Sequence, residues 1–219
     1  MSSGPDQQKD ALADWLRIRT AIAWPRWSGV VHPLAEPAAP DGFRVFFAAT
    51  RGCRDAEGVV RVLTALDLAL ADAEQGAQPT FSLMANWQRT VLHRDVVAFR
   101  SLPAFAKGGR ERYGLAPDTH ARFVHCLAES ASPDLPLPSR AARAYLDVLF
   151  FHPFEDGNAR AAMLALAFVL GRDGVSLDQV HPLQAIRWAD DAEGAADLAV
   201  LLGILITAAE RRLSNRSKS

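Results

Sequence analysis

The sequence predicts an all-α protein with at most a few short strands. Apolar residues recur at helical spacing through most of the 219 residues. Hydrophobic residues make up 49% of the chain, which is enough for a sizeable core. Residues 99–118, which hold three glycines around a polar tip, have the composition of a loop or hairpin. A chain of this length fits one domain, or one domain with a small appendage.

The first part of the chain alternates helical patterns with proline-rich or short apolar segments. Residues 10–22 and 55–73 place apolar side chains on one side of a helix. Between them, residues 24–42 contain four prolines and predict an irregular connection. Residues 43–49 (FRVFFAA) predict a short strand or a buried apolar turn. A further helix is expected from about residue 79 to 94.

The second part of the chain is expected to be almost entirely helical. Residues 119–130 form one predicted helix, and Ser139 is a suitable N-cap for the next, which ends at residue 151. Another begins near Asn158 and is expected to stop at Gly171.

The last third is predicted to hold helices over 178–189 and 192–213, followed by a basic tail. Its longest apolar stretch, residues 198–209, is too short to span a bilayer and predicts a buried helix.

Charge and cysteine content exclude several classes of protein. The net charge is -1 and the pI is about 6.6, so neither a nucleic-acid partner nor a membrane surface is favoured. Cys53 and Cys126 lack metal-site spacing and are expected to be reduced thiols. The polar N-terminal residues carry no signal peptide, so a cytoplasmic location is expected.

A cluster of polar residues, FHPFEDGNARAAM at 151–163, interrupts two apolar runs. His152 falls at the end of the predicted helix, and Pro153 cannot continue that helix. Phe154 is apolar and is expected to anchor the intervening loop to the core. Asn158 is a good N-cap for the helix that follows.

This loop therefore delivers functional groups to a helix N-terminus, where free N–H groups and the helix dipole favour an anion. Gly157 and Ala159 are small enough for a ligand to approach the backbone closely. Arg160 lies in the first helical turn, where its charge opposes the helix dipole unless a phosphate lies between them. Asp156 could hold Mg²⁺, and His152 can accept a proton at neutral pH. The set suits phosphoryl or nucleotidyl transfer to a hydroxyl. A helix–loop–helix corner with an N-cap asparagine would explain part of the pattern without any function.

The residues HPFEDGNAR resemble the signature of the Fic (Fic/Doc, or Fido) family, H-x-F-x-[D/E]-G-N-G-R-x-x-R. The resemblance covers about residues 80–175 and implies a Fic-type helical bundle, with a helix–loop–helix active-site core and a β-hairpin flap at 104–117. Residues 1–79 would then be an N-terminal extension packed on this core, and residues 176–219 would be C-terminal helices and a basic tail. The matching positions are His152, Phe154, Asp156, Gly157, Asn158 and Arg160.

The resemblance implies transfer of a phosphate-containing group, most often AMP from ATP, to a hydroxyl of a protein target. His152 would deprotonate that hydroxyl, and Asp156 would coordinate Mg²⁺. The flap would align a segment of the target by strand-like pairing.

The same resemblance assigns phosphate binding to the start of the second motif helix. The backbone of Gly157, Asn158 and Ala159, with the Asn158 side chain, would form an anion hole. Arg160 would hold phosphate oxygens.

Two departures from the family pattern bear on the donor. Ala159 replaces the usual glycine, and Met163 stands where a second arginine would hold the γ-phosphate of ATP. Another donor is therefore an open alternative, in a kinase-like or phosphocholine-type reaction, as is a small-molecule acceptor in a biosynthetic pathway. A degenerate, non-catalytic binding protein is the alternative from another class. The inhibitory [S/T]-x-x-x-E-[G/N] motif of the family is absent from the sequence, so any inhibitor would act differently or be a separate protein.

Overall fold

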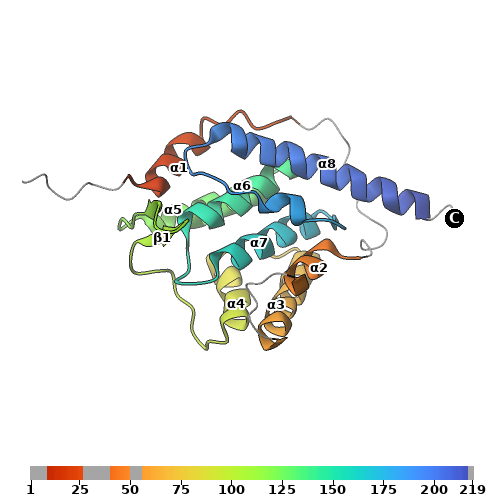
Figure 1. Cartoon of the computed structure of the whole chain (residues 1–219), viewed down its shortest axis with the longest axis horizontal. Coiled ribbons are helices and arrows are strands. Elements are labelled where there is room, and N and C mark those ends of the chain that lie inside the picture. The colour runs from red at the N-terminus through yellow and green to blue at the C-terminus, as the bar shows by residue number, and fades with distance from the viewer. Residues whose placement is uncertain (1–8, 27–39, 50–55, 217–219) are drawn as a thin grey trace, which may run out of the picture.

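The computed structural model describes residues 9–26, 40–49 and 56–216, and this part of the chain is predominantly helical (Figure 1). It contains eight α-helices and one two-stranded antiparallel sheet, which confirms the predicted all-α class with a short hairpin. The helices are α1 (Ala11–Arg19), α2 (Gly42–Ala49), α3 (Ala56–Glu74), α4 (Phe81–Leu92), α5 (Thr119–Ala128), α6 (Leu137–Phe151), α7 (Asn158–Arg172) and α8 (Ala192–Arg216). The hairpin pairs β1 (Ala104–Ala106) with β2 (Glu111–Tyr113), and 3₁₀ turns cover Glu129–Ala131 (η1) and His181–Gln184 (η2).

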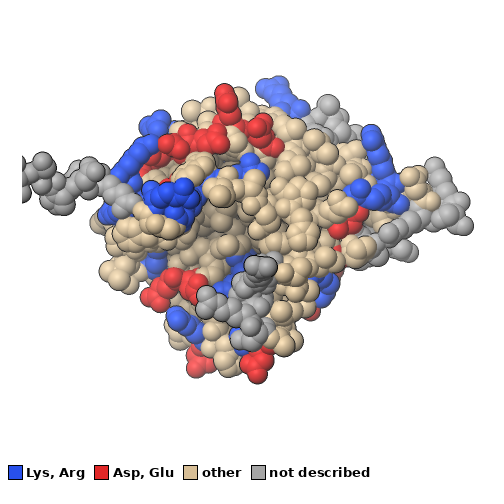
Figure 2. All heavy atoms as spheres, in the orientation of Figure 1, with Lys and Arg blue, Asp and Glu red and all other residues tan. Residues whose placement is uncertain are grey.

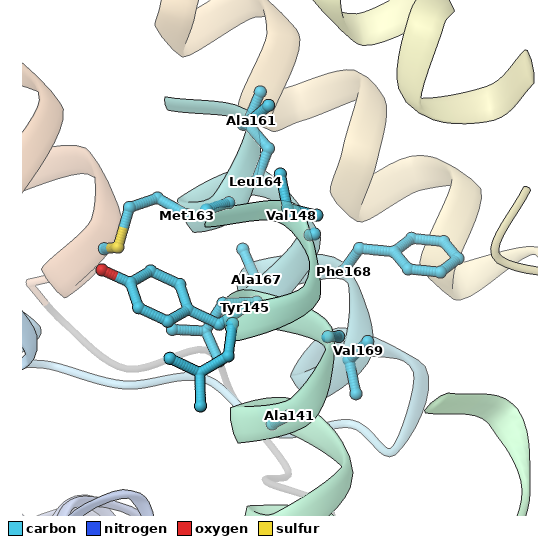
Figure 3. Packing of buried hydrophobic residues seen from close by; sticks show 14 of the residues in the cluster. Ala141, Tyr145, Val148, Ala161, Met163, Leu164, Ala167, Phe168 and Val169 are labelled. Atoms are coloured by element: carbon cyan, nitrogen blue, oxygen red, sulfur yellow. The ribbon is translucent and has the colours of Figure 1, made fainter. Parts of the chain in front are cut away.

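The α6–α7 pair forms the centre of the molecule. Helix α7 packs between α6 on one side and α3 and α4 on the other, while α8 covers another face of α6 (Figure 1). All ten residues from Ala161 to Leu170 are buried, and four of these ten are alanines, whose small side chains allow the helices to approach closely. Figure 3 shows Tyr145 and Val148 of α6 packed with apolar side chains of α7. A rigid pair of helices therefore carries the motif loop that joins them.

An ion pair buried in the core ties the N-terminal helix to α6. The Asp147 carboxylate is fully buried and accepts hydrogen bonds from Arg19 Nε at 2.7 Å and from Trp15 Nε1 at 2.9 Å. Arg19 also donates to Glu129 at 2.6 Å. Helix α1 is thus part of the same core as the motif helices. The domain boundaries themselves stay predictions.

The expectation of a strand or turn at 43–49 is wrong, because these residues form α2. The Asp41 side chain accepts from the N–H of Phe43 at 2.8 Å and so caps the helix start. Phe43, Phe46 and Phe47 are buried at helical spacing. In such a short apolar run, helix and strand cannot be told apart by periodicity alone.

Two helix ends also differ from expectation. Ser139 is not an N-cap: α6 already begins at Leu137, and the Ser139 hydroxyl instead donates to the carbonyl of Pro25 at 3.1 Å. Gly171 does not stop α7, which runs to Arg172, and the left-handed residue beyond it is Gly174.

The expected helix over 178–189 is wrong as well. Only the short turn η2 forms there, and an irregular connection of residues 185–191, with a turn at 189–190, leads from it to α8.

Helix α8 is longer than the apolar stretch that predicted it. Its residues Ala192–Asn215 are long and apolar enough, by length and composition, to cross a membrane, unlike the stretch 198–209 alone. The side chains of Leu198, Leu202 and Ile206 are nevertheless buried in the core, on a helix that packs against α6. A core helix passes the same test, so this feature is weak evidence for a membrane location.

The charged surface matches the near-neutral composition. On the face shown in Figure 2, basic and acidic side chains occur in small, separate groups. Cys126 is a free, buried thiol, and burial raises its pKa to about 12. It is therefore unreactive at neutral pH. Cys53 lies outside the described residues.

Candidate functional site

His152 lies at the C-terminal end of α6, where the chain turns sharply into the motif loop. Its backbone is left-handed, with φ 46° and ψ 58°, and its N–H donates to the carbonyl of Val148 at 3.2 Å. Such a conformation is uncommon for a non-glycine residue, and Pro153 prevents the helix from continuing. The His152 side chain at this helix end is half-buried.

The loop is closed on itself by Asn158 and fixed to the core by Phe154. The Asn158 side chain accepts from the N–H of Phe154 at 3.0 Å and donates to its carbonyl at 2.8 Å. The Phe154 ring is buried and stacks on Phe81, with centroids 5.5 Å apart. Asn158 is therefore not the N-cap of α7, a position that Gly157 takes. The Asn158 side chain is thus engaged within the loop through its amide oxygen and one N–H of its amide nitrogen, which leaves a second side-chain N–H and the backbone N–H as donors.

A second clamp on the loop comes from Gln88 of α4, which the sequence did not single out. Gln88 is fully buried, and its Nε2 donates to the carbonyl of Asp156 at 2.7 Å. Gly157 next to it has φ +74°, and a Cβ there would lie 2.4 Å from Gln88 Nε2. Glycine is thus required at this position both by its backbone conformation and by the close approach of Gln88.

We expect Gly157→Ala to weaken anion binding at this loop at least tenfold, because the added methyl must displace Gln88 or change the backbone. Phosphate or nucleotide affinity, measured by calorimetry, checks this. Gly76→Ala is the matched control, since Gly76 also has positive φ but a Cβ added there would meet no atom within 4 Å. Equal affinity of the Gly157→Ala and Gly76→Ala proteins would contradict the assigned role.

The start of α7 presents donors and charges suited to a phosphate. The first intrahelical bond runs from Ala161 N to Gly157 O at 2.9 Å, so the preceding N–H groups of the first turn have no acceptor within the helix. Ala159 is exposed, which places its methyl at the surface of this end. The Arg160 guanidinium lies 3.8 Å from the Asp156 carboxylate, and its side chain is 25% exposed.

Asp156 is the residue that would hold Mg²⁺, and its surroundings fit that role. Its side chain is 71% exposed at the mouth of the loop. No cluster of three His, Cys, Asp or Glu side chains that could hold a metal occurs among the described residues. A single accessible carboxylate is nevertheless what Mg²⁺ commonly takes when phosphate oxygens and water complete its shell.

Burial keeps the His152 imidazole neutral. The pKa of His152 is lowered to about 4, chiefly by burial. The nearby Leu149 carbonyl raises this pKa in part, and the positive charge of Arg100 lowers it. Nδ1 is buried, and no hydrogen bond of good geometry to it is found in the described part of the chain. A neutral ring can accept a proton at pH 7, and Nε2 is the nitrogen left to do so.

This lowered pKa predicts a pH dependence of stability. The unfolded chain binds a proton at His152 near pH 6.5, whereas the folded protein does so only near pH 4. The free energy of unfolding should therefore be highest above pH 6.5 and should fall by up to about 3 kcal/mol as the pH drops to 4. Urea unfolding of His152→Asn should show a shallower fall. His93→Asn is the control, since His93 has the same left-handed C-cap conformation on α4 but an exposed ring. Parallel pH profiles for the wild type and His152→Asn would contradict the expectation.

Comparison with known proteins identifies this arrangement. Residues 81–170 match the model of the Fic/DOC family, a span that begins at α4 and ends in α7. Residues 81–170 are thus similar to a Fic domain. No protein of curated function matches the sequence.

Solved structures with the same fold are Fic domains too. IbpAFic2 covalently tethered to Cdc42 has a TM-score of 0.58 at 12% identity, covering 89% of this chain and 70% of that chain. A His-to-Ala variant of IbpAFic2 in complex with adenylylated Cdc42 has a TM-score of 0.57 at 12% identity, covering 92% and 70%. IbpAFic2 alone has a TM-score of 0.54 at 14% identity, covering 93% and 70%. At these identities the likeness shows a shared fold.

Arg100 connects the flap to the motif, a second contact that the sequence did not reveal. The flap here is the hairpin of β1 and β2. The Arg100 side chain is buried and donates to the carbonyls of Phe151 at 3.1 Å, Leu102 at 2.6 Å and Gly114 at 2.5 Å. The backbone N–H of Arg100 donates to the carbonyl of Pro153 at 2.9 Å. One arginine thus joins both ends of the flap to the end of α6.

The position of the family's second arginine is closed to a ligand. Met163 is 2% exposed, and its sulfur lies 3.8 Å from Gln184 Nε2 of η2. Figure 3 shows its side chain extending to the same side of the helix pair as the Tyr145 ring. Arg160 is thus the arginine that α7 contributes at the motif loop.

Proposed function

We propose that this Fic domain is a transferase that moves a phosphate-containing group, in the first instance AMP from ATP, onto a hydroxyl of a protein target. The observation that carries the proposal is one rigid loop that combines a neutral imidazole, an exposed carboxylate and a helix N-terminus flanked by Arg160. These are the groups that in-line phosphoryl or nucleotidyl transfer needs, since it depends on positioning and charge neutralisation.

His152 acts as the general base. It accepts the proton of the target hydroxyl while the hydroxyl oxygen bonds to the α-phosphorus and pyrophosphate leaves. The N–H groups of the first turn of α7 and the Arg160 guanidinium bind phosphate oxygens. Asp156 holds Mg²⁺, which neutralises phosphate charge when bound.

The flap offers an edge for an extended segment of the target. The outer edge of β2 is bridged by Asp10, opposite Arg112, whereas β1 has no second neighbour among the described strands. Leu102, just before β1, and Phe105, within β1, are 72% and 58% exposed. A target strand would therefore pair with β1 and place apolar side chains on these two residues.

The buried Met163 favours a second candidate within the same chemistry. Without a cation at this position, the γ-phosphate of ATP adds little to the binding free energy. A donor without a γ-phosphate is therefore an alternative. Kinase-like or phosphocholine-type transfer, or a small-molecule acceptor, would use the same loop. A non-catalytic binding protein is the remaining alternative.

Calorimetry with Mg²⁺ and ATP, ADP or a cytidine diphosphate conjugate separates these candidates. We expect ATP and ADP to bind within about threefold of each other, because little holds the γ-phosphate. Arg160→Ala should weaken both by about 10- to 100-fold, the range for losing a charge-assisted hydrogen bond.

Arg122→Ala is the matched control, since Arg122 is exposed on α5 and its partner among the described residues is Asp118. Selective binding of the cytidine conjugate would favour another donor. No binding of any nucleotide would contradict the proposal and favour a non-catalytic protein.

A further inference from the structure

One aromatic side chain of the flap covers the motif histidine. Tyr113 of β2 is 1% exposed, and its ring stacks on the His152 imidazole with centroids 4.4 Å apart and an interplanar angle of 19°. It also contacts Phe150 of α6, at 6.4 Å between centroids. Since no hydrogen bond of good geometry to Nδ1 is found among the described residues, the stack on Tyr113 is the contact best able to set the plane of the imidazole.

Tyr113 is in turn held by a buried carboxylate. Glu111, two residues earlier on β2, is 7% exposed, and its Oε2 accepts from the Tyr113 hydroxyl and from Lys107 Nζ. Its Oε1 accepts from the N–H of Ala189 at 3.2 Å. Burial and the Glu111 contact raise the pKa of the Tyr113 hydroxyl, so it stays a donor. A buried carboxylate with three donors is a fixed point in the structure.

The same carboxylate ties the flap to the connection of residues 185–191 before α8. Lys107 Nζ lies 4.3 Å from the centroid of the Trp188 ring, and Arg110 lies 5.3 Å from the same ring. Cation–π contacts of this kind add to the hydrogen bond from Ala189. The flap is therefore anchored at its tip by residues that the family motif does not include.

We propose that Tyr113 is a positioning residue for His152, and that Glu111 fixes Tyr113 by anchoring the flap to the connection before α8. The inference rests on the proposed function only in that His152 is the base. Tyr113 holds the imidazole plane and keeps water from one of its faces. Arg100, Lys107 and Glu111 are the charged groups that act on the same ring.

Substitution of Tyr113 separates stacking from hydrogen bonding. Tyr113→Phe keeps the ring and loses only the hydroxyl, whereas Tyr113→Ala uncovers the imidazole face. The His152 pKa is measured by NMR titration of histidine-labelled protein without any substrate, with His152→Asn assigning the signal. We expect the Phe variant to stay near the wild-type value of about 4 and the Ala variant to rise by about one unit or more.

The ring-current shift of the His152 protons should persist in Tyr113→Phe and vanish in Tyr113→Ala. Arg112→Ala, which alters the residue between Glu111 and Tyr113, should leave both signals unchanged. If Tyr113→Ala fails to fold, Tyr113→Leu fills the space without a ring and carries the same expectation for the ring-current shift. An unchanged His152 signal in the variant without a ring, or equal changes in the Phe and Ala variants, would overturn the proposal.

Kinetics give a second readout where transfer is detected. Glu111→Gln should lower kcat about tenfold with KM within about twofold, because it loosens Tyr113 without touching the donor site. A rise in KM with kcat unchanged would instead assign Glu111 to target binding and contradict the positioning role. Since the titration needs no activity, it decides the inference even if the protein transfers nothing.

Discussion

His152→Asn is expected to lower the rate of transfer by about 10²- to 10⁴-fold, the usual contribution of a general base. Asparagine is chosen because it tolerates the left-handed backbone at this position, where φ is 46°. Alanine in the same conformation would add about 1–2 kcal/mol of strain. A lower rate could then come either from the missing base or from a distorted loop. Labelling rates in a cell lysate measure the first effect, and thermal unfolding at pH 8 verifies that the fold is kept.

His93→Asn controls for the change of residue type at a left-handed helix end. It should transfer at the wild-type rate, because His93 is exposed at the end of α4. Retention of more than about a tenth of the activity in His152→Asn would exclude His152 as the base.

Asp147→Ala is expected to destabilise the protein by about 3–5 kcal/mol, the cost of leaving a buried charge without its partner. Asp147 is fully buried, and Arg19 donates to both of its oxygens, at 2.7 Å and 2.8 Å. The substitution strands the guanidinium in the core between α1 and α6. Urea unfolding at pH 7 gives the change in free energy.

Asp118→Ala is the matched surface control, because its partner Arg122 is exposed and such pairs contribute about 0–1 kcal/mol. The double variant Arg19→Met, Asp147→Leu should recover most of the loss, since it removes both buried charges. A double variant as unstable as Asp147→Ala would show that the ion pair is not the cause.

The long helices could be predicted from sequence because their periodicity extends over several turns. Residues 56–74 and 192–216 repeat apolar side chains often enough for neighbouring turns to agree. The run at 43–49 is only two helical turns long and nearly all apolar. Its sequence therefore shows no periodicity that would distinguish a helix from a buried strand. The segment 178–189 has apolar residues, but Pro182 falls inside it and its backbone makes only the turn η2.

The motif loop could be predicted because its candidate site residues are adjacent in sequence. The residues that hold the loop in place are distant in sequence and could not be predicted. Gln88, Arg100 and Tyr113 come from α4, the segment before the flap and the flap itself, and only the fold brings them to the loop. A glutamine within the apolar pattern of α4 was the one available signal for Gln88. The N-cap expectation for Asn158 was wrong for a related reason: its side chain satisfies Phe154 across the loop, and left-handed Gly157 starts the helix instead.

Incubation of the protein, Mg²⁺ and lysate with ATP labelled at either the α- or the γ-phosphate tests most directly whether His152 drives transfer from a nucleotide bound at the start of α7. We expect label on protein from the α-phosphate, and we expect this label to be lost in His152→Asn. Label from the γ-phosphate alone would contradict AMP transfer and assign a kinase-like orientation. α-Phosphate label that survives in His152→Asn would contradict the assignment of the base.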